Sequence, residues 1–163
     1  MRTFIVEKDW ITAAGLRAVV IKSRHRCGYV AVREDHPAFG KNYNEQLDCI
    51  SQDAVDTAEL GSKSPIIVLT AAVGSDRPHE KVRRSLDILI DVHGSLTYSS
   101  TSRADLYPVE SEGNWWFGFD CAHYRDDESI GGQPLDYCVA ECERMATQFA
   151  ALATVPAIAI NKE

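Results

Sequence analysis

Six apolar side chains near the end of the chain recur at alternating spacings of three and four residues, and this stripe constrains the fold more than any other feature. Its members are Leu135, Cys138, Cys142, Met145, Phe149 and Leu152. Residues with this spacing lie on one side of an α-helix. Pro134, a residue type that suits the first turn of a helix, stands just before them. The pattern predicts an amphipathic helix from Pro134 to Leu152 that packs against a sheet, with Glu141 and Gln148 off the apolar stripe.

Two segments near the start of the chain have the composition of β-strands. The run Leu16 to Lys22 follows Gly15 and is rich in β-branched residues, which favour strands. Residues 27–32 have a similar composition. The polar connection Ser23 to Arg26 between them is short enough for a hairpin, so we expect the two strands to pair antiparallel.

The middle of the chain gives a more ambiguous pattern. Ser51 has the character of a helix N-cap and Gly61 that of a C-terminal residue, so a short helix is predicted between them. A second short helix is predicted from Asp76 to Asp87, where Pro78 stands near a first-turn position. The apolar run from Pro65 to Val73 favours a strand through its β-branched content, although its length also fits a buried helix.

Two further strands are predicted around a long polar loop. Residues 88–98 are strand-like and carry His93, and the aromatic segment Trp115 to His123 follows after a loop rich in serine, glycine and charge. We expect these two strands to pair antiparallel. The whole pattern predicts one α+β domain spanning residues 1–163, with a mainly antiparallel sheet packed against the long C-terminal helix.

Charge and hydropathy limit the partners of this chain. Acidic residues outnumber basic ones 24 to 17, giving a formal net charge of -7, so general nucleic-acid binding is not expected. The first residues reach charge after three apolar ones, which is too short for a signal-peptide core, and no stretch is long enough to cross a bilayer. We therefore expect a cytoplasmic protein without membrane contact. The sequence does not indicate an oligomeric state.

The five cysteines are candidates for core, ligand or nucleophile roles. Their number is odd and their spacing is not that of a small secreted disulfide framework, so free thiols are expected. Cys138 and Cys142 lie on the apolar stripe of the predicted helix, which favours core packing for both.

The candidate site gathers Cys121, His123 and His93. Side chains alternate along a strand, so Cys121 and His123 share a face, with their α-carbons about 6.5 Å apart. His93 lies on the predicted partner strand. If the register brings His93 opposite them, a thiol and two imidazoles converge in a common pocket.

Two chemical hypotheses follow for this site. In one, Cys121, His123 and His93 bind zinc and leave a fourth position for an activated water. In the other, a histidine takes the proton of Cys121 to make a thiolate nucleophile, and a carboxylate such as Asp120, Asp126 or Asp127 orients the imidazole. The pattern also fits a structural alternative, in which Cys121 is a buried small hydrophobe and His123 an exposed residue at a strand end.

Aromatic and basic side chains offer a second kind of site. Trp116 and its aromatic neighbours are candidates for stacking on a planar ligand such as a nucleobase, and Arg24 or Arg26 for receiving its phosphate. Tyr98 completes this candidate ligand-binding set. Core packing of the aromatic residues and solvation of the arginines fit the same sequence.

Several motifs resemble a family of small, generally uncharacterised proteins encoded by bacteriophages and prophages. They are Arg26-Cys-Gly-Tyr-Val, Val92-His-Gly-Ser-Leu-Thr-Tyr and Trp115-Trp-Phe-Gly-Phe-Asp-Cys-Ala-His. The resemblance spans most of the chain from Trp10 to the final helix. Ser95 stands where the family pattern usually has a second glycine, and the stretch from about Ile50 to Ile90 is longer than in the family pattern.

The resemblance implies an accessory protein in the cytoplasm of a bacterial host, and it implies no particular reaction. The candidate sites and this context together leave three functional hypotheses. The first is an enzyme, most simply a hydrolase, that uses the Cys121 and histidine site. The second is a non-catalytic binder that sequesters a small anionic, nucleotide-like host signal. The third is a protein that blocks a host factor by surface contact.

Overall fold

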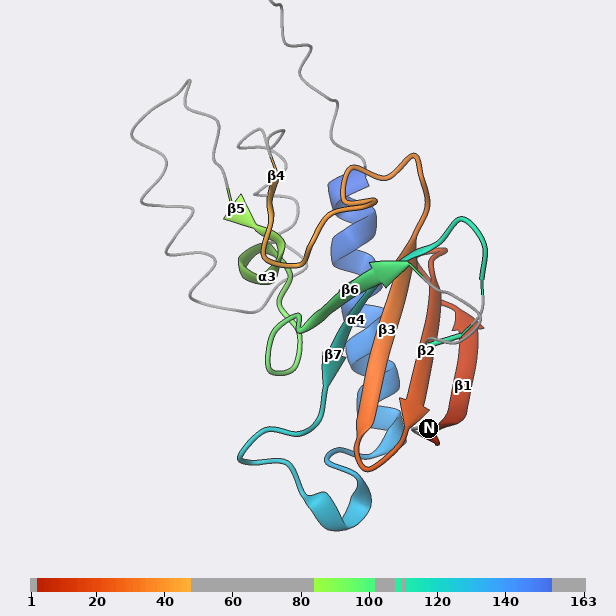
Figure 1. The fold of residues 1–163 in the computed structure, drawn as a ribbon, viewed down its shortest axis with the longest axis vertical. Helices are drawn as coiled ribbons and strands as arrows, with labels where there is room; N and C mark the ends of the chain where they lie inside the picture. Colours follow the sequence, from red (N-terminus) through yellow and green to blue (C-terminus); the bar gives the residue numbers. More distant parts are fainter. Residues whose placement is uncertain (1–2, 48–83, 102–107, 110, 154–163) are drawn as a thin grey trace, which may run out of the picture.

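The computed structural model describes residues 3–47, 84–101, 108–109 and 111–153 (Figure 1). Within these ranges the chain forms a mixed α+β fold, as the sequence predicts: a five-stranded antiparallel sheet and a long C-terminal helix. The predicted helix from 51 to 61, the predicted strand from 65 to 73 and nearly all of the predicted helix from 76 to 87 lie outside the described residues. No helix in the described ranges is long and apolar enough to cross a membrane.

The sheet has the strand order β1-β2-β3-β7-β6, and every neighbouring pair is antiparallel. Its strands are β1 (Ile5–Ile11), β2 (Arg17–Lys22), β3 (Arg26–Val32), β6 (Tyr98–Thr101) and β7 (Trp115–Asp120). The predicted hairpin of β2 and β3 is confirmed, with Lys22 paired to Arg26 at the turn. The predicted pairing of residues 88–98 with the aromatic segment is wrong in its bounds, because the strand that pairs with β7 is β6, which shares only Tyr98 with the predicted strand.

Helix α4 (Leu135–Ala153) covers one face of the sheet and packs against β2 and β3 (Figure 1). Five of the six stripe residues of α4 are buried against the sheet, and Leu135 is partly buried against the same core. The prediction that Glu141 and Gln148 lie off the buried side is wrong, since both are buried. Their polar groups are satisfied by backbone groups of a neighbouring segment, described below, and this pairing makes their burial tolerable.

The structure differs from two of the predicted strands. The segment around His93 is not a strand: β5 (Arg84–Ser85) and the short helix α3 (Leu86–Leu89) precede it, and residues 91–97 run through a turn before β6 begins. β7 ends at Asp120, so Cys121 and His123 lie beyond it. The remaining elements are β4 (Gln46–Leu47), which pairs with β5, and the 3-10 helix η1 (Glu128–Ile130).

Aromatic rings on β3 and β7 lie over glycines of the opposite strand. Gly28 is paired with Phe119, and Gly118 with Tyr29. A Cβ atom at either glycine would overlap the ring of its partner. These contacts fill the space above both glycines with protein, one on the α4 side of the sheet and one on the other side.

Candidate functional site

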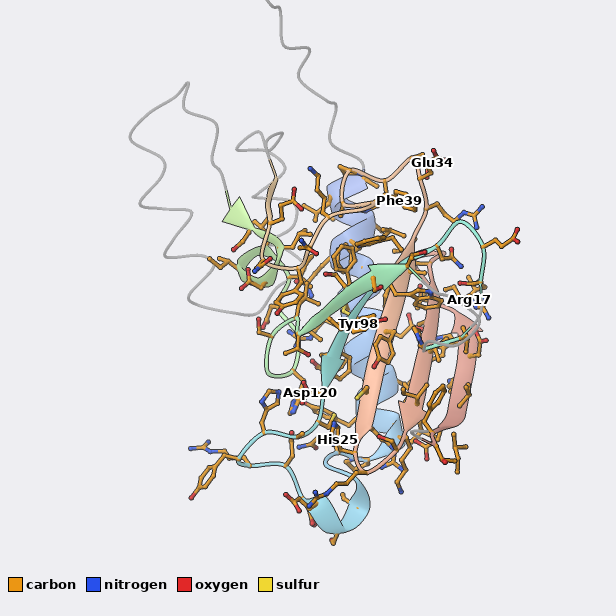
Figure 2. The ribbon with its side chains drawn as sticks, viewed as in Figure 1. Arg17, His25, Glu34, Phe39, Tyr98 and Asp120 are labelled. Atoms are coloured by element: carbon orange, nitrogen blue, oxygen red, sulfur yellow. The ribbon has the colours of Figure 1, made fainter. Side chains whose placement is uncertain are left out.

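The candidate site lies at the end of the sheet where β7 stops and β3 starts. Figure 2 shows Asp120 and His25 at this end, consistent with the pairing of Asp120 to Cys27. A pocket of about 210 Å³ opens here. Its lining residues are Arg24, His25, Cys121, Ala122, His123, Asp126 and Glu128. Two of the three residues predicted to converge, Cys121 and His123, therefore line one pocket.

His93 is held by hydrogen bonds at both ring nitrogens. Its Nε2 is 2.9 Å from Oδ2 of Asp126, and its Nδ1 is 3.0 Å from the hydroxyl of Tyr137 on α4. An ionised carboxylate only accepts, so Nε2 carries a hydrogen and donates to Asp126. In the neutral ring Nδ1 then accepts from the Tyr137 hydroxyl. The result is a Tyr137, His93, Asp126 chain beside the pocket.

Polar side chains of α4 fix the backbone that carries His93. The amide N–H of His93 donates to Oε2 of Glu141 at 2.7 Å. Gln148 accepts from the N–H of Asp91 at 2.7 Å and donates to the carbonyl of the same residue at 2.8 Å. Arg144 donates to the Asp91 carboxylate at 2.6 Å. Side chains of α4 therefore hold the His93 turn against the helix through hydrogen bonds.

His123 packs on the turn that follows His93. The two imidazole rings have centroids 5.5 Å apart. Gly94 has φ +63°, and a Cβ there would overlap the His123 ring, so the ring rests on bare backbone. Nε2 of His123 lies 3.8 Å from Oδ1 of Asp120. His123 is about two-fifths exposed at its side chain, which leaves part of the ring open to the pocket.

Asp126 joins the two histidines. Its side chain is 2% exposed, and it accepts from the ring of His93, from the backbone N–H of His123 at 3.0 Å and from Nε2 of Gln133 at 2.8 Å. Burial acts to raise the pKa of this carboxyl, but the hydrogen bonds from Gln133, His93 and His123 outweigh it and hold the pKa below its usual range. Asp126 is therefore a buried anion that orients both histidine segments.

The sulfur of Cys121 contacts a second thiol. Its sulfur lies 3.6 Å from that of Cys138 on α4, and the two residues are 1% and 0% exposed. The backbone of Gly132 packs directly on Cys121, leaving no room for a side chain at that position. The three predicted metal ligands thus separate into a histidine pair and a thiol pair. Among the described residues, no three His, Cys, Asp or Glu side chains form a group that could hold a metal ion.

The predicted ligand-binding set is divided among different environments. Trp116 is fully buried on the sheet face opposite α4, where Tyr98 also packs, so neither ring belongs to the pocket wall. Arg26 donates to Glu7 at 2.6 Å and to the carbonyls of Ile130 and Gln133, each at 2.8 Å, and so ties β3 to β1 and to the loop before α4. Of the four, Arg24 alone lines the pocket, where it pairs with Glu128 at 3.3 Å.

The sequence patterns did not indicate Tyr137, Gln133 or Glu141 as site residues. Tyr137 and Glu141 lie on α4 one turn apart, on the edge of the buried side that faces the His93 turn. Their spacing of four residues is a helical signal, but it points to a site only once the turn they contact is known. No family model, curated protein or solved structure matches this chain.

Proposed function

We propose that this protein is a small-ligand hydrolase in which His123 moves protons at the pocket. The observation that carries the proposal is the setting of that imidazole. His123 lines the pocket, has Asp120 3.8 Å from its Nε2, and belongs to a loop that the buried Asp126 holds through the His123 N–H. A partly exposed imidazole beside a carboxylate is the usual arrangement of a general base.

The chemistry follows from these positions. His123 takes a proton from a water in the pocket, and the hydroxide attacks the electrophilic centre of the bound ligand. The Asp120 carboxylate offsets the charge of the imidazolium that forms. The imidazolium then returns the proton to the leaving group. His93, with both nitrogens bonded to Asp126 and Tyr137, positions the His123 ring and does not itself contact the ligand.

This assignment favours the general-base route over the other two routes predicted from the sequence. A thiolate mechanism needs Cys121 beside an imidazole, whereas the sulfur contact of Cys121 is Cys138. A zinc mechanism needs three converging ligands, and those residues are divided between two pairs. The resemblance to small phage proteins suits an accessory enzyme of this size and stays a prediction.

Hydrolysis of chromogenic esters tests the proposal. The probes are p-nitrophenyl acetate, p-nitrophenyl phosphate and bis(p-nitrophenyl) phosphate, followed by release of nitrophenolate. Replacing His123 by glutamine is expected to lower the rate with the reactive probe by at least about 100-fold, the usual contribution of a general base. The matched control is Tyr124→Phe, a fully exposed neighbour that does not line the pocket. Rates equal to buffer for all three probes, or an H123Q variant as fast as the unchanged protein, contradict the proposal.

One observation supports the second candidate, a non-catalytic binder of a small anion. Arg24, His25 and His123 bring three nitrogen-bearing side chains to one pocket. Such groups recognise phosphate or carboxylate. A binder of this kind is expected to melt at a higher temperature with adenosine monophosphate than with adenosine, and to lose that difference in the Arg24→Gln variant. Equal melting temperatures with the two probes count against binding of a phosphate.

A further inference from the structure

Two buried sulfur atoms meet at the wall of the pocket. Cys121 follows the last residue of β7, and Cys138 lies in the first turns of α4, yet their Sγ atoms are 3.6 Å apart. A disulfide bond is about 2.05 Å long, so closing this pair needs an approach of roughly 1.5 Å. The two sulfurs are already in contact, so this approach requires only a small movement.

Cys121 is the one residue of the pair that lines the pocket, although it is 1% exposed. Cys138 lies behind Cys121 against the core. The other described thiols lack this arrangement. Neither Cys27 nor Cys142 lines the pocket.

The contact between the two thiols makes Cys138 the more acidic of the pair. The hydrogen bond from Cys121 lowers the pKa of Cys138 against the effect of burial, and the Arg26 guanidinium lowers it further. The same contact raises the pKa of Cys121. The two sulfurs are 3.6 Å apart, so transfer of one proton from Cys121 to Cys138 gives the Cys121 thiolate, the form that attacks a peroxide.

We propose that Cys121 and Cys138 form a redox site that a hydroperoxide oxidises to a disulfide and a thiol reductant restores. The Cys121 thiolate attacks one oxygen of hydrogen peroxide; an S–O bond forms, the O–O bond breaks and hydroxide leaves. That hydroxide takes the proton of Cys138 and becomes water. The Cys138 thiolate then attacks the sulfur of the Cys121 sulfenic acid; the S–S bond forms, the S–O bond breaks and a second hydroxide leaves.

The bond would join the two segments that carry the candidate site. Cys121 lies two residues before His123, and Cys138 directly follows Tyr137, whose hydroxyl contacts His93. Drawing the two sulfurs together pulls the start of α4 toward the end of β7. The redox site therefore stands beside the histidine pair without using any of its atoms.

Counting thiols in the full-length protein tests the proposal. The protein is treated with hydrogen peroxide, denatured without reductant and alkylated with N-ethylmaleimide. The unchanged chain has five cysteines, and we expect the alkylated thiols to fall from five to three. Peptide mapping is expected to find Cys121 linked to Cys138, and dithiothreitol to restore all five thiols.

Matched variants identify the pair. Cys142 is as buried as Cys138 and lies one helical turn further along the same side of α4. Cys142→Ser is expected to keep the loss of two thiols, and Cys138→Ser to abolish it and leave a sulfenic acid at Cys121 that dimedone traps. Five thiols remaining after peroxide, or a linkage that involves any other cysteine, overturns the proposal. The peptide map of the unchanged protein decides the matter even if the Cys138 variant does not fold.

Discussion

The side-chain amide of Gln148 makes two hydrogen bonds to the backbone of Asp91, one through its oxygen and one through its nitrogen. The oxygen accepts the Asp91 N–H at 2.7 Å, and the nitrogen donates to the Asp91 carbonyl at 2.8 Å. This is the pairing that a neighbouring strand would make, supplied instead by one side chain of a helix. It explains how the His93 turn keeps its place without belonging to the sheet.

Gln148→Leu is expected to destabilise the protein by about 2 kcal/mol, since it removes the two hydrogen bonds between the Gln148 side chain and the Asp91 backbone in a partly buried site. Leucine is close in size, so a cavity contributes little. Urea unfolding measures the change. Thr147→Leu, at the exposed neighbouring position, is the control and should stay within about 0.5 kcal/mol of the unchanged protein. Equal midpoints for the two variants would contradict the role assigned to Gln148.

The sequence predicted the parts of the fold that rest on local patterns. The stripe on α4 and the β-branched runs of β2 and β3 each bury one side of a regular element, and such periodicity is visible without knowing the partner. The predicted strand at 88–98 is wrong because the apolar residues of this segment enter the core partly from the end of a short helix and partly from a loop. No single period therefore runs through the segment. β1 carries four charged or aromatic residues between its exposed ends, and no alternation marked it as a strand.

The candidate site was predicted in part for a related reason. The sequence predicted that His93 and His123 lie close together, and their ring centroids are 5.5 Å apart, although His93 lies in a turn and not on a strand paired with β7. Asp126, one of three carboxylates considered for orienting an imidazole, does contact His93. The partner of Cys121 was not predicted, because it lies on a helix whose approach to the end of β7 depends on the whole sheet.

Gly94→Ala is expected to cost more stability than Gly40→Ala. Both glycines have positive φ, +63° and +76°, so alanine is strained by about 1 to 2 kcal/mol at each. Only at Gly94 does the new methyl group overlap another side chain, the ring of His123; nothing lies within 4 Å at Gly40. Urea unfolding compares the variants, and the His123 ring signals in NMR should move in G94A alone. Unmoved signals in G94A would show that the ring does not rest on this backbone.

Ser95 offers a related test, because it is a non-glycine residue with φ +80°. Glycine adopts this left-handed conformation at lower cost than serine. Ser95→Gly and Ser95→Ala both remove the hydroxyl that donates to the Asp87 carbonyl at 3.2 Å. They differ in backbone strain, so we expect S95G to be the more stable variant by about 1 kcal/mol in thermal or urea unfolding. A less stable S95G would mean that the turn is not held at positive φ.

Asp126 is expected to make the stability of the protein depend on pH in the acid range. Its pKa in the folded chain is below the value of about 3.9 for an unfolded aspartate. The depressed pKa means that the carboxylate contributes its full stabilisation above that unfolded value, and that the contribution is lost as the pH falls through the folded pKa. Asp126→Asn removes this contribution.

The unchanged protein should therefore be more stable than D126N by about 2 kcal/mol at pH 6, the scale of hydrogen bonds to a charged group. The difference should shrink progressively below about pH 4, since protonation of Asp126 weakens its bonds from His93 and Gln133. Urea unfolding from pH 6 to pH 3 measures it, with Asp35→Asn at an exposed loop position as the control. If the gap between the unchanged protein and D126N is the same at both ends of this range, the charge on Asp126 is not what holds the two histidine segments together.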